Sequence, residues 1–411
     1  MRKRYGVLFL LVLLAIITFL DRISISVAAP RIQQDLGISP ARWGWILGAF
    51  VLAYGLFEIP TGALGDRSGQ RGVLMRVVLW WSVFTGLTGL AQSYPVLLIT
   101  RFLFGAGEAG AYPNIAGALA RWFPPTERAR TQGFIWSASR LGGALAPLIV
   151  VPLQGSIGWR ASFGVLGAMG AVWAILWRAW FHDSPAEQPG ITQQELEEIG
   201  PGTRVMGHVS IPWGLLLSKA QLWLIFAMYF LQAFGSWFYF GWFPVYLMKG
   251  SGFSEKEMGL FTALPFLMGA AGNLVGGFLS DAMVRRIGLK SGRRIMGCLG
   301  LLGEAVLLVS MTMTRDHTAV VVLSSAGFGV ADLMLPTAWA VCLDIGGTRA
   351  GVVSAVMNTA GQLGGFVCSV LFGYMVEATH NYQQPVWIVS GCVLAAALLF
   401  TRIDATKKLF D

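Results

Sequence analysis

Apolar segments of roughly 20 residues recur along the whole chain, and they constrain its fold more than any other feature. A helix of that length crosses the ~30 Å hydrocarbon core of a bilayer, where only helices and closed barrels satisfy every backbone hydrogen bond. Hydrophobic residues make up 55% and charged residues 12% of the 411 residues, whereas soluble proteins carry about 25% charge. The sequence therefore predicts an all-α integral membrane protein.

The hydrophobic runs predict twelve membrane-spanning helices. Their ranges are 5–29, 43–64, 72–92, 95–120, 131–153, 160–181, 220–248, 256–280, 293–313, 317–343, 350–374 and 384–402. The first run is longer than the apolar part of a signal peptide, and no small-x-small cleavage site follows it. We therefore interpret it as the first span.

Basic residues follow the loops between these spans. If both termini are cytoplasmic, most of the Lys and Arg residues fall in inner segments. The positive-inside rule then predicts a multi-pass protein of the cell inner (plasma) membrane with cytoplasmic N- and C-termini. This distribution also explains the net charge of +9 without a nucleic-acid partner.

The longest polar interruption covers residues 182–219 and separates the spans into two groups of six. It contains TQQELEEI, which predicts a short surface helix opened by a capping box of Thr192 and Glu195. We predict an N-terminal six-helix bundle at 1–181, a cytoplasmic linker at 182–219 and a C-terminal six-helix bundle at 220–411.

A loop motif is repeated in the two halves. GALGDRSGQR at 62–71 follows the second span, and GGFLSDAMVRRIGLKSGRR at 276–294 follows the eighth. The residues that align at one offset are Gly62, Leu64 and Asp66 with Gly277, Leu279 and Asp281. Duplicated halves predict a substrate cavity at their interface near the bilayer midplane.

The first of these loops is a candidate for conformational gating. Gly62 allows helices to approach closely, and Asp66 is predicted to pair with Arg67, Arg71 or a neighbouring helix end when the inner face is closed. Asp281 is the corresponding residue in the second half. The alternative is an ordinary solvated turn.

Five charged residues inside the predicted spans of the first half are candidate site residues: Asp21, Arg22, Arg101, Glu108 and Arg140. Asp21 and Arg22 point about 100° apart around a helix, so each needs a partner elsewhere or an aqueous cavity. Their depths, at 1.5 Å per residue, predict couplings of Asp21 with Arg101 and of Glu108 with Arg140. Alternatively, Asp21 and Arg101 form a static clamp, a permanent ion pair that only holds two helices together. The alternative for Arg140 is a structural pair with Glu108 alone, without contact to the substrate.

Such couplings suit a symporter. A carboxylate beside an arginine stays ionised, and its proton affinity rises when an anionic substrate occupies the arginine. Substrate and proton therefore favour each other's binding.

Other polar and aromatic side chains are candidate substrate contacts, although packing explains each aromatic residue equally well. Asn358 and Gln362 are four residues apart and share a helix face. The remaining candidates are Tyr54, Ser139, Tyr239 and Trp242. Three acidic residues in the spans, Glu58, Glu304 and Asp332, receive no assigned role.

The loop motif, with FLDRISISVAAP, RFLFGAGEAGAYPNIAGALARWFP and DIGGTRAGVVSAVMNTAGQLGG, resembles the major facilitator superfamily and, within it, the anion:cation symporter family. This family includes bacterial sugar-acid transporters and vesicular glutamate and sialic acid transporters. The resemblance implies twelve helices in two pseudo-symmetric six-helix bundles. It also implies proton-coupled symport of a small organic anion, such as a sugar acid, by alternating access.

The resemblance further implies residue roles. Asp21 and Glu108 correspond to the proton carriers, and Arg22 to the arginine that holds the substrate carboxylate. The chain departs from the sugar-acid pattern at Ser139 and Arg140, where Gln and Tyr are usual. A third arginine predicts a substrate with more negative charge or a second acidic group.

An anion exchanger or an organophosphate carrier of the same fold would use the three arginines to clamp a phosphate, and an obligate exchanger would not need Glu108. GAGEAG at 105–110 matches a dinucleotide-binding pattern but lies inside a span, so its glycines predict close helix packing. We expect no enzymatic activity, no metal and no cofactor other than the coupling proton, and a functional monomer.

Overall fold

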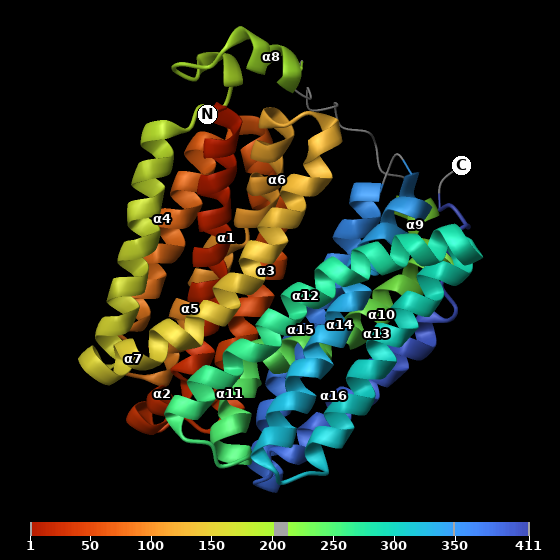
Figure 1. The fold of residues 1–411 in the computed structure, drawn as a ribbon. Helices are drawn as coiled ribbons and strands as arrows, with labels where there is room; N and C mark the ends of the chain where they lie inside the picture. Colours follow the sequence, from red (N-terminus) through yellow and green to blue (C-terminus); the bar gives the residue numbers. More distant parts are fainter. Residues whose placement is uncertain (1, 201–212, 348–349, 410–411) are drawn as a thin grey trace. The chain divides into compact units, whose positions relative to one another are not determined.

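The computed structural model describes residues 2–200, 213–347 and 350–409, and every regular element in these ranges is helical (Figure 1). Two compact units make up the chain. Unit 1 consists of Met1–Ala28 and Ala49–Ser210, and unit 2 consists of Ala29–Gly48 and Ile211–Asp411.

Unit 1 contains most of the N-terminal helices. They are α1 (Lys3–Val27), the larger part of α3 (Pro40–Ser68), α4 (Gln70–Thr88), α5 (Tyr94–Glu108), α6 (Ala111–Trp122), α7 (Pro125–Trp180), the short turn η1 (Pro185–Glu187) and α8 (Gln193–Ile199).

Unit 2 contains the C-terminal helices together with α2 (Ala29–Leu36) and the first turns of α3. The others are α9 (Trp213–Leu217), α10 (Ala220–Trp237), η2 (Phe238–Trp242), α11 (Phe243–Val245), η3 (Tyr246–Gly250), α12 (Glu255–Ile287), α13 (Leu289–Thr312), α14 (His317–Gly346), α15 (Ala350–Thr379) and α16 (Gln383–Phe400). The turns η2 and η3 are wide π-helical turns that continue α10.

Nine helical segments in the described ranges are long and apolar enough to cross a membrane. One of them, α7, supplies two crossings because Gly158 separates its two arms with a φ of 80°, a value that favours glycine. The 19-residue α4 and the α5–α6 pair complete the twelve predicted crossings. The all-helical, twelve-span fold class is thus confirmed.

The fourth crossing differs from its prediction as one continuous helix over 95–120. It is broken between Glu108, where α5 ends, and Ala111, where α6 begins. Pro113 explains the break, because it has no backbone N–H to donate and its ring crowds the carbonyl group four residues earlier. Glu108 therefore lies at an interrupted helix, an arrangement that transporters use around their binding sites.

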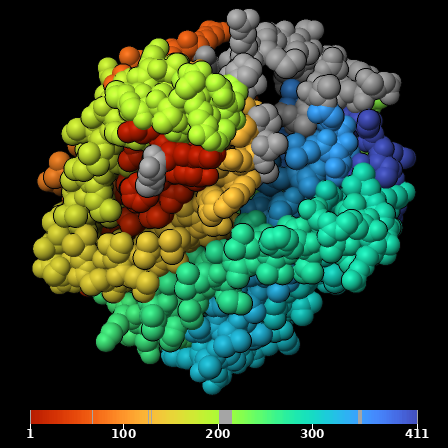
Figure 2. Space-filling view, turned by 45° about the horizontal axis from the view of Figure 1, so that its top comes forward, coloured from red at the N-terminus to blue at the C-terminus, as the bar shows by residue number. Residues whose placement is uncertain are grey.

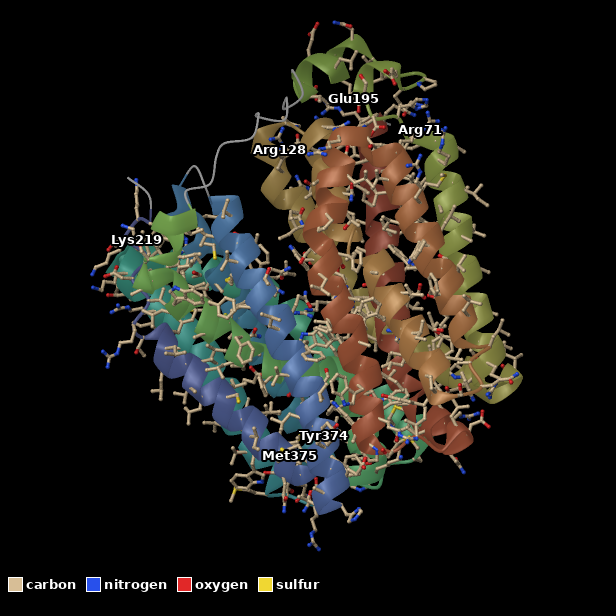
Figure 3. The ribbon with its side chains drawn as sticks, turned by 180° about the vertical axis from the view of Figure 1, so that it is seen from behind. Arg71, Arg128, Glu195, Lys219, Tyr374 and Met375 are labelled. Atoms are coloured by element: carbon tan, nitrogen blue, oxygen red, sulfur yellow. The ribbon has the colours of Figure 1, made fainter. Side chains whose placement is uncertain are left out.

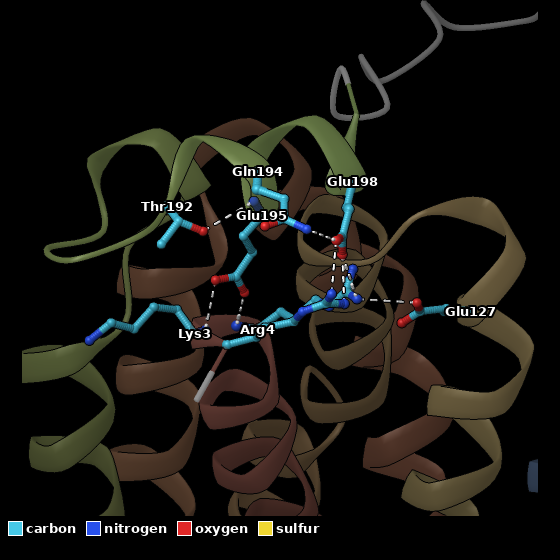
Figure 4. Close-up of polar contacts among 8 residues, drawn as sticks. Lys3, Arg4, Glu127, Thr192, Gln194, Glu195 and Glu198 are labelled. Atoms are coloured by element: carbon cyan, nitrogen blue, oxygen red, sulfur yellow. Dashed lines mark hydrogen bonds and ion pairs between the residues drawn. The ribbon is translucent and has the colours of Figure 1, made fainter.

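The acidic helix α8 caps the start of α1 (Figure 4). Thr192 accepts a hydrogen bond from the Glu195 amide, as predicted. The Glu195 carboxylate does not close the capping box, however, because it accepts the amides of Lys3 and Arg4 at 3.0 and 2.9 Å. These first-turn donors have no partner within α1, and a negative charge there is favourable.

Glu198 and Glu127 extend the same cluster. The buried Arg4 guanidinium lies 3.1 Å from Glu198 and 3.3 Å from Glu127 at the start of α7. Figure 2 shows the segment around α8 lying against the N-terminal helix. The part of the linker around α8 is therefore held to unit 1 by half-buried charge pairs with Arg4 and by the bonds of Glu195, which the acidic composition alone did not reveal.

Replacing Glu195 by Gln removes the charge that caps α1. We expect the free energy of unfolding to fall by about 1 kcal/mol, which lowers the melting temperature of the detergent-purified protein by about 1–3 °C. The matched control is Glu197→Gln on the exposed side of the same helix, which should melt like the wild type. Equal melting temperatures for the two variants would contradict the capping role.

Candidate functional site

The five charged candidate residues of the first half all lie in unit 1 and are almost completely enclosed. Each exposes no more than about a tenth of its side-chain surface. Asp21 and Arg22 come from α1, Arg101 and Glu108 from α5, and Arg140 from the first arm of α7. Three helices therefore bring charged groups to membrane depth, where charges mark functional sites.

Arg22 and Glu108 form a direct ion pair at the centre of this group. The Arg22 Nε–H donates to Glu108 Oε1 at 2.8 Å, and an Nη2–H donates to the same oxygen. The other oxygen, Oε2, has no hydrogen-bond partner in the described part of the chain. One acceptor atom of Glu108 thus holds the arginine while the other remains available.

The sequence prediction coupled Glu108 to Arg140 and did not foresee this pair with Arg22. The prediction compared Cα depths for Asp21, Arg101, Glu108 and Arg140 and did not consider Arg22 as a partner. It also neglected the reach of the long arginine side chain. Arg140 instead acts electrostatically on Tyr112.

Aromatic rings surround the Arg22 guanidinium. Its central carbon lies 4.8 Å from the ring centre of Phe19, 5.3 Å from that of Phe50 and 5.0 Å from that of Tyr54. The faces of such rings attract a cation by about 0.5–2 kcal/mol each. Tyr54, which was predicted to contact the substrate, therefore lies beside Arg22, the predicted substrate-binding arginine.

Asp21 has a different environment. It lies in the electrostatic field of Arg101 and Glu108, but it forms no direct ion pair with Arg101, and neither carboxylate oxygen has a hydrogen-bond partner among the described residues. The Arg101 guanidinium lies 4.1 Å from the ring centre of Phe104 and 5.3 Å from that of Phe50. The predicted Asp21–Arg101 coupling is thus electrostatic, without the direct contact of a static clamp.

A hydroxyl chain forms another wall of the site. Tyr112 of α6 bonds Ser139 Oγ at 2.6 Å, and Ser139 donates to the Ile135 carbonyl at 2.8 Å. The Tyr112 ring stacks on Trp136, with centres 5.0 Å apart and planes 7° apart. Sequence reasoning assigned no role to Tyr112, although it follows Glu108 by four residues.

Close helix approach positions these groups. A Cβ atom on Gly105 of α5 would lie 2.4 Å from the Phe50 carbonyl oxygen of α3, closer than real atoms come. Glycine at this position therefore lets α5 carry Arg101 and Glu108 against the α3 aromatic rings. This packing role agrees with the interpretation of GAGEAG in the sequence.

The candidates of unit 2 have varied surroundings. The buried Tyr239 hydroxyl donates to the Ser324 carbonyl at 2.8 Å, and the Trp242 indole donates to the Ser369 carbonyl at 3.1 Å. These bonds favour packing roles for both residues. Asn358 and Gln362 share α15 and are half-buried, and their contact with a substrate stays a prediction.

The repeated loop motif ends a helix in each unit. In unit 1, a Cβ atom on Gly62 would lie 3.0 Å from Pro113, which supports the predicted close approach. Arg71 donates to the Arg178 carbonyl at 3.1 and 2.9 Å, not to Asp66. The side chain of Asp66 lies outside the described residues.

Charge pairs hold the ends of these loops. Asp183 accepts the amides of Gln70 and Arg71 at the start of α4, and Arg71 lies at the same end of unit 1 as Glu195 (Figure 3). In unit 2, Asp281 lies 3.4 Å from Arg293 of the following helix. The gating role of Gly62, Asp66, Arg67, Arg71 and Asp281 stays a prediction.

Known proteins resemble the whole chain. A model of the Major Facilitator Superfamily matches residues 11–369. A probable sulfoacetate transporter of Cupriavidus necator is 37% identical over 402 residues, or 97% of this chain and 93% of that protein. A hexuronate transporter of Bacillus subtilis is 30% identical over 410 residues, or 98% and 94%.

A solved structure has the same fold. It is a bacterial homologue of the human lysosomal transporter Spinster, and it matches with a TM-score of 0.81 and 20% identity over 98% of this chain and 97% of that one.

The buried pair predicts a double-mutant cycle. Arg22→Met leaves the Glu108 charge without its partner and should cost about 3–5 kcal/mol at neutral pH, with a smaller loss in acid, where Glu108 is protonated. Arg22→Met combined with Glu108→Gln removes both charges and should recover most of the stability. Melting temperatures of the four proteins measure the coupling. Additive losses would show that the two residues do not interact.

Proposed function

Because the chain belongs to the major facilitator superfamily, we propose that this multi-pass membrane transporter carries a small organic anion together with protons. The family consists of transporters and not enzymes, and the similar proteins of C. necator and B. subtilis carry names of anion transporters. Symport, the identity of the anion and alternating access between two bundles are the proposed parts.

The Arg22–Glu108 ion pair is the observation that carries the proposal. Arg22 donates to Glu108, and such a donor stabilises the ionised form of a carboxylate. A substrate carboxylate or sulfonate competes for the same guanidinium. Once Arg22 turns to the substrate, Glu108 is a completely buried carboxylate without its donor, and binding a proton avoids the cost of that charge.

The balance of charges favours a substrate with two acidic groups. The site combines three arginines with two carboxyl groups, so it has an excess of positive charge even when both acids are ionised. Protonation of Asp21 and Glu108 increases that excess. A dianion such as sulfoacetate, which the C. necator relative is named for, or a sugar diacid would neutralise more of it than a hexuronate would.

Asp21 is proposed as the second proton carrier. Its carboxylate lies in the field of Arg101, which attracts a negative charge, and of Glu108, which repels one. Protonation of Glu108 removes the repulsion, so the two sites are coupled. Binding of a second anionic group near Arg101 would in turn favour protonation of Asp21.

An anion exchanger or organophosphate carrier is the alternative. The guanidinium carbons of Arg22 and Arg101 each lie 5.3 Å from the centre of the Phe50 ring, and two guanidinium groups suit a phosphate as well as two acidic groups. An exchanger requires no proton transfer. We also propose a location in the plasma membrane, cytoplasmic termini and function as a monomer.

Purified protein in liposomes that contain a pH dye tests the proposal. Sulfoacetate, aldarates, hexuronates, aldonates, short dicarboxylates and sugar phosphates are added one at a time, without an imposed gradient. We expect a dianionic compound to acidify the lumen. Glu108→Gln should abolish this acidification, because a glutamine amide cannot bind and release a proton near neutral pH, while Glu197→Gln at the exposed face of α8 should retain it.

Two outcomes of this experiment would contradict proton symport of an organic acid. If no compound moves protons but a labelled anion still exchanges across the membrane, the exchanger reading replaces symport. If only sugar phosphates are carried, the organophosphate alternative is correct.

A further inference from the structure

Tyr112 of α6 lies on the helix face that carries Glu108. It follows Glu108 by four residues, and the two residues at the break after α5, Ala109 and Gly110, keep right-handed helical backbone angles. Residues four apart in a helix share one face. The break between α5 and α6 therefore leaves Tyr112 directed to the same side as Glu108.

The ring of Phe19 joins Tyr112 to Arg22. The Arg22 guanidinium carbon lies 4.8 Å from the centre of the Phe19 ring. The Tyr112 ring meets the same Phe19 ring at 90°, with the two centres 6.4 Å apart, and it also stacks on Trp136. Two aromatic contacts thus hold the Tyr112 hydroxyl in place next to the arginine that pairs with Glu108.

The hydrogen bonds of Tyr112 and Ser139 have a fixed direction. A serine hydroxyl has one hydrogen, and Ser139 donates it to the Ile135 carbonyl at 2.8 Å, because a carbonyl can only accept. In the 2.6 Å bond between Tyr112 and Ser139, the tyrosine is therefore the donor. With its hydrogen used in this way, the Tyr112 oxygen can only accept a further hydrogen bond.

An acceptor beside a group of arginines recognises one kind of chemical group. A carboxylate or sulfonate offers acceptors alone, so the Tyr112 oxygen repels it. An ammonium group can donate, but the excess of positive charge in the site disfavours it. A hydroxyl group is neutral and carries a hydrogen, so it fits this position.

We propose that Tyr112 is a specificity-determining residue, which accepts a hydrogen bond from a substrate hydroxyl next to the acidic group held by Arg22. Ser139 is a positioning residue, because it takes up the tyrosine hydrogen and so fixes Tyr112 as an acceptor. The inference rests on the proposed function, in which Arg22 binds an acidic substrate. It also divides the proposed dianions, since a sugar diacid carries hydroxyl groups and sulfoacetate has none.

Diacids of equal charge test the direction of this bond. Succinate has no group for Tyr112, malate adds a hydroxyl that can donate, and oxaloacetate adds a keto oxygen that can only accept. Adipate and galactarate are a longer pair without and with hydroxyl groups, and sulfoacetate is a dianion without one. Calorimetry gives their dissociation constants for the detergent-purified protein, so the readout requires no proton transport.

Each protein should have its own order of affinities. The wild type should bind malate about 5-fold tighter than succinate, as expected for about one hydrogen bond, and oxaloacetate no tighter than succinate. Tyr112→Phe should bind malate only as tightly as succinate and leave succinate binding unchanged. Ser139→Ala frees the tyrosine hydrogen to donate, so oxaloacetate should bind about 5-fold tighter while malate binding is kept. A residue that only packs would weaken the binding of all these anions alike.

The chain supplies a matched control for each substitution. Ser162, in the second arm of α7, is buried and donates to the Gly158 carbonyl at 2.8 Å, four residues earlier, as Ser139 does to Ile135. Tyr246 is a buried tyrosine of unit 2. Ser162→Ala and Tyr246→Phe should keep the wild-type preference for malate over succinate and for galactarate over adipate.

The outcomes separate the two proposals. A wild-type protein that binds none of these anions refutes the organic dianion of the proposed function, and the inference with it. Equal binding of hydroxylated and unhydroxylated diacids, or equal malate binding in the wild type and Tyr112→Phe, refutes the role of Tyr112 alone. Oxaloacetate binding that stays unchanged in Ser139→Ala refutes the positioning role of Ser139.

Discussion

The buried ion pair of Arg22 and Glu108 is the interaction on which the site depends. Placing two charges at membrane depth costs several kcal/mol for each ion unless each neutralises the other. Here one carboxylate oxygen of Glu108 and the rings of Phe19 and Tyr54 offset the cost of burying the Arg22 charge. If a substrate displaces Glu108 from Arg22, both charges of the pair still need neutralising. An acidic substrate neutralises the guanidinium, and a proton neutralises the released Glu108.

A helix break at Pro113 and a close helix contact at Gly105 position the Arg22–Glu108 pair. Pro113 ends the regular hydrogen bonding of the fourth crossing next to Glu108, and Gly105 brings α5 against the carbonyl of Phe50. A continuous, bulkier helix would hold Glu108 farther from Arg22. At the far end of unit 1, Glu195 and Glu198 fix the start of α1, the helix that carries Asp21 and Arg22.

The sequence specified the membrane spans and the charged residues of the site, because a charge within an apolar run is visible without a structure. It did not specify the pairing. The depth comparison did not consider Arg22 as a partner of Glu108, and only the side-chain positions show that its guanidinium reaches that carboxylate. Likewise, Glu195 matched a local capping box, but its carboxylate bonds α1, which no local pattern reveals. Pro113 was a readable signal for the helix break that the hydrophobic pattern concealed.

The central claim is that an anion takes Arg22 from Glu108 and that Glu108 then takes up a proton. Calorimetric titration of the purified protein with its substrate, in buffers of different ionisation enthalpy, counts the protons bound with each anion. The account predicts net uptake of about one proton through Glu108 near neutral pH, and this uptake is lost in Glu108→Gln. Tight binding without proton uptake in the wild type, or equal uptake in the variant, would contradict it.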